Sequence, residues 1–106
     1  MKAVVLDHCV PRPFGKLLTD CAITTAFERG WAELTNSDLL CAAEATAIDV
    51  LITADQNLRY QQNLATRRIA IIELPTNRLR LVSQYAARVN EILATIEPGA
   101  YEIVVL

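Results

Sequence analysis

The chain of 106 residues has few of the groups that mark several common classes of protein. It has one histidine and three cysteines, Cys9, Cys21 and Cys41, and no C-x-x-C spacing, so neither a zinc cluster nor a disulfide framework is predicted. Ten basic and twelve acidic residues give a formal net charge of −2, so any nucleic-acid site has to be local. We expect the cysteines to be small buried residues in a reducing cytoplasm.

Long apolar runs are also missing. Glu44 and Asp49 interrupt the most apolar region, residues 39–54, so no membrane span is predicted. The apolar stretch near the N-terminus ends at Asp7, which is too short for the hydrophobic part of a secretory signal. With 53% hydrophobic and 21% charged residues, the composition is that of an ordered globular protein. We therefore expect a soluble, cytoplasmic single domain over residues 1–106, with no membrane partner.

Two classes of α/β protein are disfavoured by what is absent. The sequence has no G-x-x-x-x-G-K-[ST] run, which a P-loop nucleotide enzyme needs to hold phosphates. A phospho-receiver domain also places acids after its first and third strands, but it requires a lysine near the end of a later strand. The only lysines here are Lys2 and Lys16, and neither is in such a place.

Short apolar runs alternate with amphipathic segments along the chain. Strands are predicted at 3–6, 21–25, 49–53, 69–74 and 101–106. Helices are predicted at 12–19, 37–47, 56–66 and 76–98, and Asn36 and Ser37 are the expected N-caps of the second. This alternation predicts a three-layer α/β/α domain with a mainly parallel sheet. Leu81, Tyr85 and Ile92 widen the apolar face of the last helix, which predicts a homodimer.

Three acids are expected to meet at one edge of this sheet. Asp7 and Asp55 follow the first and third strands, and Asp38 lies in the first turn of the helix that precedes the third strand. In an open parallel sheet, ligands bind beyond the carboxyl ends of the strands. Carboxylates that converge there repel one another unless a divalent cation such as Mg²⁺ or Mn²⁺ neutralises them. Such a site can activate water against a phosphodiester.

Each acid also has a purely structural interpretation. Asp7 would cap the following helix, Asp38 would complement a helix N-terminus, and Asp55 would hold an Asx turn. Glu44 lies about 120° around the helix from Asp38 and is interpreted as part of a solvated face. The expected convergence of three acids favours the functional interpretation.

Several short motifs follow one another in a familiar order: Leu6-Asp7 with Pro11-Arg12, then Gly30-Trp31, Ser37-Asp38-x-x-Leu-Leu, and the run from Leu51 to Leu58. Over residues 3–75 they resemble the small PIN-like domains that are linked to toxin–antitoxin systems. The resemblance implies a ribonuclease whose catalytic and metal-binding acids are Asp7, Asp38 and Asp55. It also implies Mg²⁺ or Mn²⁺ as the cofactor, RNA as the substrate and an antitoxin as a protein partner.

The chain departs from that family at two places. Its members often carry Asp-Glu-Asn after the first strand and Asp-x-Asp-Phe after the third, whereas this chain has Asp7-His8-Cys9 and Asp55-Gln56-Asn57-Leu58. One carboxylate is therefore missing at each place. His8 and the side-chain carbonyl of Asn57 are the expected secondary members of the site. The lost charge leaves open an alternative, a catalytically degenerate module that binds RNA or a protein through the same edge.

A second group of residues is typical of a track for single-stranded RNA, because cations and an aromatic ring occur close together. Its members are Arg59, Tyr60, Arg67 and Arg68. A solvated helix face is the alternative interpretation of this group. Arg12, which follows the first strand, is predicted to contact a phosphate. Trp31 is interpreted as a packing residue.

Overall fold

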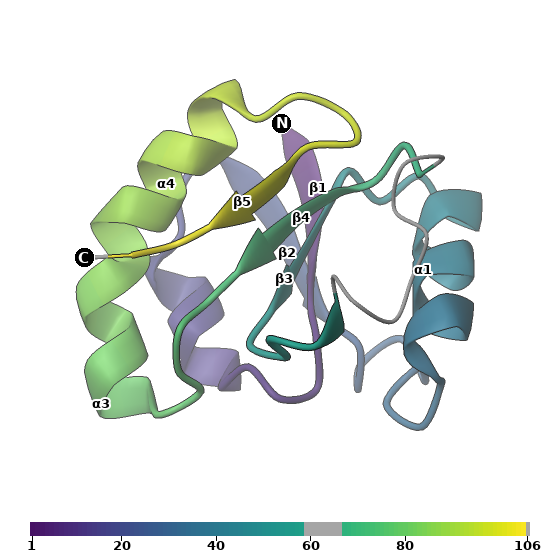
Figure 1. Cartoon of the computed structure of the whole chain (residues 1–106), viewed down its shortest axis with the longest axis horizontal. Coiled ribbons are helices and arrows are strands. Elements are labelled where there is room, and N and C mark those ends of the chain that lie inside the picture. The colour runs from purple at the N-terminus through teal and green to yellow at the C-terminus, as the bar shows by residue number, and fades with distance from the viewer. Residues whose placement is uncertain (59–66, 106) are drawn as a thin grey trace.

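The computed structural model describes residues 1–58 and 67–105, and within them five strands form one sheet (Figure 1). All neighbouring strands are parallel, in the order β2-β1-β3-β4-β5. The strands are β1 (Lys2–Leu6), β2 (Cys21–Thr25), β3 (Val50–Thr53), β4 (Ala70–Glu73) and β5 (Tyr101–Ile103). The predicted α/β class with a parallel sheet is therefore confirmed.

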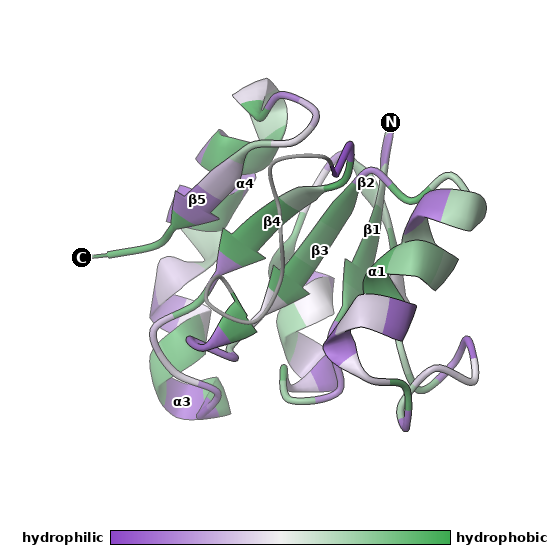
Figure 2. Cartoon of the chain, turned by 45° about the vertical axis from the view of Figure 1, so that its right-hand side comes forward, coloured by the Kyte–Doolittle hydropathy of each residue, from purple (hydrophilic) through white to green (hydrophobic). Residues whose placement is uncertain are grey.

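Helices cover both faces of the sheet. Successive side chains of a strand point to opposite faces, so each face presents its own set of apolar side chains to a layer of helices. On one face, helix α1 (Asn36–Ala45) packs on Val5, Leu51 and Ile71. The other face contributes Val4, Leu6, Val50, Ile52 and Ile72 to a larger apolar cluster. It is covered by η1 (Arg12–Leu17), α3 (Leu79–Val82), η3 (Ser83–Tyr85) and α4 (Ala86–Thr95). Figure 2 shows the hydrophobic strands β1, β3 and β4 between α1 and α4.

The segment predicted as one helix over 76–98 is divided in the structure into α3, η3 and α4. At the break, the Ser83 hydroxyl donates to the Arg80 carbonyl at 3.2 Å, a back-bond that competes with the helical ladder and bends helices. Ile92, which was expected to widen the apolar face, is buried in the core. Leu79 and Leu81 are the large apolar side chains of this segment that remain exposed.

Other boundaries also differ from expectation. The first predicted helix is the 3-10 helix η1, and Gly15 lets it lie close to β2, because a Cβ there would be 2.9 Å from the Ile23 Cγ2 atom. The N-cap of α1 is Thr35, whose Oγ1 accepts the Asp38 N–H at 3.2 Å, instead of Asn36 or Ser37. Cys41 is exposed, contrary to expectation.

The fourth predicted helix, over 56–66, falls mostly outside the described residues, and the last strand ends at Ile103 instead of 106. Every helix in the described ranges is too short or too polar to cross a bilayer.

Candidate functional site at the carboxyl edge

The carboxyl ends of β1 and β3 lie side by side where the strand order changes direction, since the chain moves from β1 outward to β2 and later returns to β3 on the other side of β1. In doubly wound sheets, this is the place where ligands bind. Asp7 follows β1 directly, and its N–H donates to the Ile52 carbonyl at 2.9 Å. The pairing of the two strands thus places Asp7 beside Thr53 at the end of β3.

The Asp7 carboxylate is 2% exposed and is held by two neighbours. Its Oδ2 accepts the Thr53 hydroxyl at 2.8 Å, and its Oδ1 accepts the His8 N–H at 2.8 Å and lies 2.9 Å from the His8 Nδ1. The next helix, η1, has Pro11 as its N-cap and no side-chain cap, so the capping role considered for Asp7 is wrong. A carboxylate oxygen has two lone pairs, so Oδ2 can accept a further partner.

Asp55 is joined to the same hydroxyl through its backbone. The Asp55 N–H donates to Thr53 Oγ1 at 3.0 Å, while this oxygen donates its own proton to Asp7. The Asp55 Oδ1 accepts the Asn57 N–H at 2.9 Å, which is the predicted Asx turn, and its Oδ2 accepts the Asn36 Nδ2 at 3.1 Å. We call Asp7, Thr53 and Asp55 the carboxyl-edge site.

Asp38 has a different environment from the other two acids. Its N–H is capped by Thr35, and its side chain is exposed and has no hydrogen-bond partner among the described residues. Asn36, at the start of the same helix, is the residue that reaches Asp55. Residues 1–58 and 67–105 contain no group of three or more His, Cys, Asp or Glu side chains arranged to hold a metal ion. The structure thus joins Asp7 and Asp55 around Thr53 and leaves Asp38 outside these hydrogen bonds.

Cys9 lies against the site as a neutral thiol. Its Sγ accepts the Ala54 N–H at 3.4 Å and lies 3.7 Å from Thr53 Oγ1. Burial raises the pKa of this thiol, and the negative charge of Asp7 raises the pKa further. Because the thiolate is the reactive form of cysteine, we assign Cys9 a packing role.

Glu73 is a buried carboxylate next to the site that was missed from the sequence. It ends β4 in register with Thr53, is almost fully buried, and accepts the Tyr101 hydroxyl at 2.7 Å. Parallel partners in register point to the same face, so Glu73 extends the row formed by Asp7 and Thr53. The signal was a charged residue inside the apolar run predicted as a strand over 69–74, since buried charges are costly and need partners.

The other residues predicted for the site and for RNA contacts differ in how they relate to Asp7 and Asp55. The His8 side chain is 58% exposed, so only its Nδ1 side faces Asp7. Asn57 contacts Asp55 through its backbone N–H instead of its side chain. Arg12 is exposed at the start of η1, and its Nε lies 3.7 Å from Glu28. The predictions for Arg59 and Tyr60 lie outside the described residues.

Arg67 and Arg68 precede β4 and therefore lie at the amino edge of the sheet, opposite Asp7 and Asp55. Arg67 donates to the Glu44 carboxylate at 2.7 Å, and the Arg68 N–H donates to the same carboxylate at 2.9 Å. The solvated face proposed for Glu44 is wrong, since the side chains of Glu44 and Arg67 are only 20% and 19% exposed. The predicted RNA track therefore does not run from these two arginines along the carboxyl edge.

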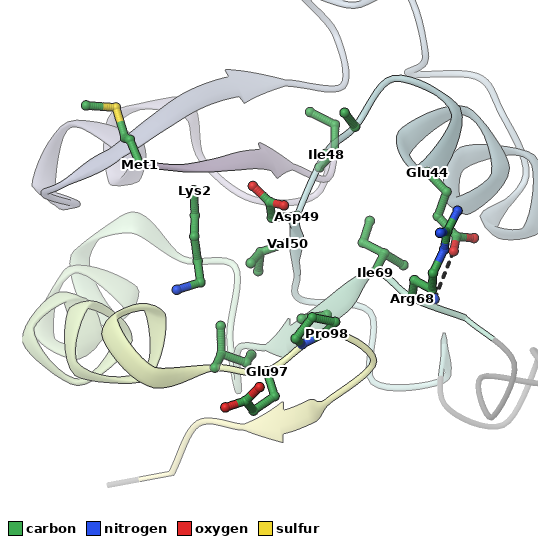
Figure 3. A pocket seen from close by; sticks show the side chains of 13 residues that line it. Met1, Lys2, Glu44, Ile48, Asp49, Val50, Arg68, Ile69, Glu97 and Pro98 are labelled. Atoms are coloured by element: carbon green, nitrogen blue, oxygen red, sulfur yellow. Dashed lines mark hydrogen bonds between the residues drawn. The ribbon is translucent and has the colours of Figure 1, made fainter.

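Figure 3 shows Glu44 and Arg68 beside an open groove of about 530 Å³ at this amino edge. Lys2, Asp49, Ile69 and Glu97 also line it. This groove is thus separated from the carboxyl-edge site by the length of the strands.

Glu44→Gln should destabilise the fold at neutral pH by about 1–2 kcal/mol, because a charge-assisted hydrogen bond is lost. Burial pushes the pKa of Glu44 upward, but the bonds from Arg67 and Arg68 outweigh this, so the pKa lies below its ordinary value of 4.5. A lowered folded-state pKa gives stability above pH 4.5 that is lost as the pH falls through the folded value. Urea unfolding from pH 7 to pH 3 measures both effects.

Exposed Glu33 gives the matched control, since Glu33→Gln removes the same charge from a side chain with no ion pair among the described residues. A wild type and a Glu44→Gln variant with the same loss of stability below pH 4.5 would contradict the role of this pair.

The residues at the carboxyl edge form an oxygen-rich site in which the Thr53 hydroxyl joins the Asp7 carboxylate to the backbone N–H of Asp55, with an imidazole at its rim. Comparison of the chain with protein-family models, curated proteins and solved structures found no match.

Proposed function

We propose that the chain is a metal-dependent endoribonuclease of PIN-like type that acts at the carboxyl-edge site. A parallel sheet with helices on both faces is compatible with the three-layer α/β/α PIN-like fold. The observation that carries the proposal is the shared Thr53 hydroxyl, which holds Asp7 and Asp55 together at the switch point of the sheet. Acidic oxygens concentrated there suit a hard divalent cation and a phosphodiester substrate.

The residues present fit Mg²⁺ or Mn²⁺ in a site of few protein ligands. Mg²⁺ keeps several waters and is commonly held by one or two carboxylates, so a cage of three acids is not required. Asp7 Oδ2 and Asp55 Oδ2 each accept one hydrogen bond and have a second lone pair for a cation. When bound, the cation would supply Lewis acidity toward water and the scissile phosphodiester.

The side chains of the chain have separate roles in this proposal. Thr53 and the Asx turn orient the carboxylates of Asp7 and Asp55. His8, with its Nδ1 beside Asp7, directs its other ring nitrogen away from this carboxylate, where it can take up or deliver a proton. Arg12 is exposed after β1 and would hold a phosphate of single-stranded RNA.

Metal binding by the purified chain tests the proposal directly. Wild-type protein titrated with Mn²⁺ in a calorimeter should bind weakly at one site, and the double variant Asp7→Asn, Asp55→Asn should bind at least about tenfold more weakly. Asp20→Asn is the matched control for each single substitution, because it removes the same charge from an exposed residue whose backbone φ of 57° is a conformation that asparagine tolerates well. Equal binding by the wild type and the double variant would exclude the assigned ligands.

The second candidate function is a non-catalytic module that binds RNA or a protein at the same edge. It is favoured by the internal hydrogen bonds of Asp7 and Asp55, which orient both acids without a cation. It differs from the nuclease in one measurable respect: RNA would be retained in a gel-shift experiment and recovered intact after incubation with Mn²⁺.

The partners expected from the sequence belong to the same proposal. As the toxin of a toxin–antitoxin pair, the chain would be inhibited by an antitoxin that covers Asp7 and Asp55. The exposed Leu79 and Leu81 on α3 provide the apolar surface for the proposed homodimer.

A further inference from the structure

The strand β5 leaves one edge of the sheet open in the described part of the chain. The Ala100 carbonyl accepts the Ile71 N–H, and the Val104 N–H donates to the Glu73 carbonyl, each at 2.9 Å. Backbone groups of alternate residues point to the same side of a strand, so those of Ile103 point away from β4. This edge thus offers a donor and an acceptor to another strand.

The side chains on one side of this edge are apolar. Ile103 and Val105 are 41% and 69% exposed, and both follow Tyr101, which packs with the α1 face of the sheet. Natural sheets usually protect a free edge with lysine, proline or a bulge. Residues 101–105 contain neither lysine nor proline, so the short length of β5 and the charge of Glu102 are the protective features that this edge has.

The other side of the edge is acidic. Glu91, Glu97 and Glu102 line a groove of about 210 Å³ between α4 and β5, and Arg88, the basic residue of this groove, is paired with Glu91 at 3.1 Å. Glu97 and Glu102 have no ion-pair partner within the described ranges. A strand that paired with β5 would direct alternate side chains into this groove. Its charge therefore favours lysine or arginine at those positions.

The same charge disfavours a second copy of this chain as the occupant. If two β5 strands paired antiparallel about Ile103, the two Glu102 side chains would lie on one face as diagonal neighbours, about 7–8 Å apart. Like charges so placed repel each other. A basic strand has no such penalty.

We propose that the β5 edge is a docking site for an extended basic peptide, which adds to the sheet as a sixth strand. Its backbone bonds to Ile103, its apolar side chains cover Ile103 and Val105, and its basic side chains on alternate positions face Glu97 and Glu102. Backbone bonds supply affinity in this mode of recognition, and the alternate side chains supply selectivity. The edge lies two strands from β3, so its occupancy does not require a functional carboxyl-edge site.

Binding of two synthetic peptides tests the proposal. One peptide of strand length alternates valine with lysine, the other alternates valine with glutamate, and both carry a fluorophore for anisotropy. The full chain should bind the lysine peptide at least about tenfold more tightly, and the Glu97→Lys, Glu102→Lys double variant should lose this preference. Glu33→Lys is the charge control for each single variant, Glu97→Lys and Glu102→Lys, since it changes the overall charge by the same amount and Glu33 is exposed in the loop before α1. Equal binding of both peptides by the wild type would overturn the proposal.

The position of the peptide is tested by amide hydrogen exchange. The lysine peptide should protect the Ile103 amide, while the Val104 amide, already bonded to Glu73, should change little. Ile103→Pro removes the outward donor and should therefore abolish peptide binding. The fold should tolerate this substitution, because proline is accepted in an edge strand when its nitrogen faces outward. Protection of Ile103 without peptide, together with a dimeric mass that Ile103→Pro abolishes, would instead identify a second copy as the occupant.

Discussion

Asp55→Asn should reduce the rate of RNA cleavage by at least about 100-fold, while the melting temperature stays unchanged or rises. Asparagine keeps a side-chain oxygen for the Asn57 N–H, so the Asx turn is preserved, and its NH2 group can donate to the Asn36 side-chain oxygen once the Asn36 amide is turned over. It removes one negative charge, so the affinity for Mg²⁺ or Mn²⁺ falls and the repulsion between Asp55 and Asp7 is relieved. Cleavage of a mixed single-stranded RNA with Mn²⁺, beside thermal melting with and without the metal, measures both quantities.

Asp38→Asn is the informative comparison. The Asp38 side chain is exposed and outside the hydrogen bonds of the carboxyl-edge site, so its loss should reduce cleavage much less than the loss of Asp55. Cleavage that persists in Asp55→Asn, or that survives an excess of chelator, would exclude this mechanism. If Asp55 only held a turn, both the activity and the metal dependence of the melting temperature would be unaffected.

Thr53→Val should destabilise the fold by about 2–3 kcal/mol. The Thr53 side chain is fully buried, and valine has nearly the same shape, so packing is preserved. The buried Asp7 carboxylate loses its hydroxyl donor, and the Asp55 N–H loses its acceptor. Urea unfolding at pH 7 gives the change in the free energy of unfolding, and Thr53→Ser, which keeps the hydroxyl, should recover most of it.

A double-mutant cycle separates this bond from general effects of the substitution. If the hydroxyl acts on the carboxylate, Thr53→Val should cost less in an Asp7→Asn background, with a coupling free energy of about 1–2 kcal/mol. Additive free energies for the two substitutions would show that Thr53 does not stabilise the Asp7 charge. If the carboxyl-edge site holds a cation as proposed, the same variants should also differ in their affinity for Mn²⁺, since Thr53 orients the Asp7 carboxylate.

The sequence predicted the fold better than it predicted the site. Continuous apolar runs such as Val50–Thr53, alternating with helices, are typical of strands covered on both faces, and this pattern is local. The positions of Asp7 and Asp55 followed from the rule that acids after parallel strands share an edge. The break at Ser83 was not predicted, because apolar periodicity continues across it and the competing side-chain bond is a matter of geometry.

The partners of each acid could not be predicted from the sequence for a different reason. That Asp7 bonds Thr53, and that Glu73 extends the same row, depends on strand order and register, which are properties of distant segments. Asn36 was expected as an N-cap and instead reaches Asp55, because the helix begins one residue earlier, with Thr35 as its cap. A one-residue shift of this kind changes which side chain faces the site.

The parallel arrangement also determines how the protein reaches its folded state. No two strands of the sheet are joined by a hairpin, so every strand pair closes a long loop of chain before it gains any contacts. Asp7 and Thr53, which meet at 2.8 Å, are 46 residues apart along the chain. Non-local pairing of this kind slows folding relative to helical proteins of similar length. The acids of the carboxyl edge therefore come together only once β1 and β3 have paired, so chains in which this step is incomplete lack the site entirely.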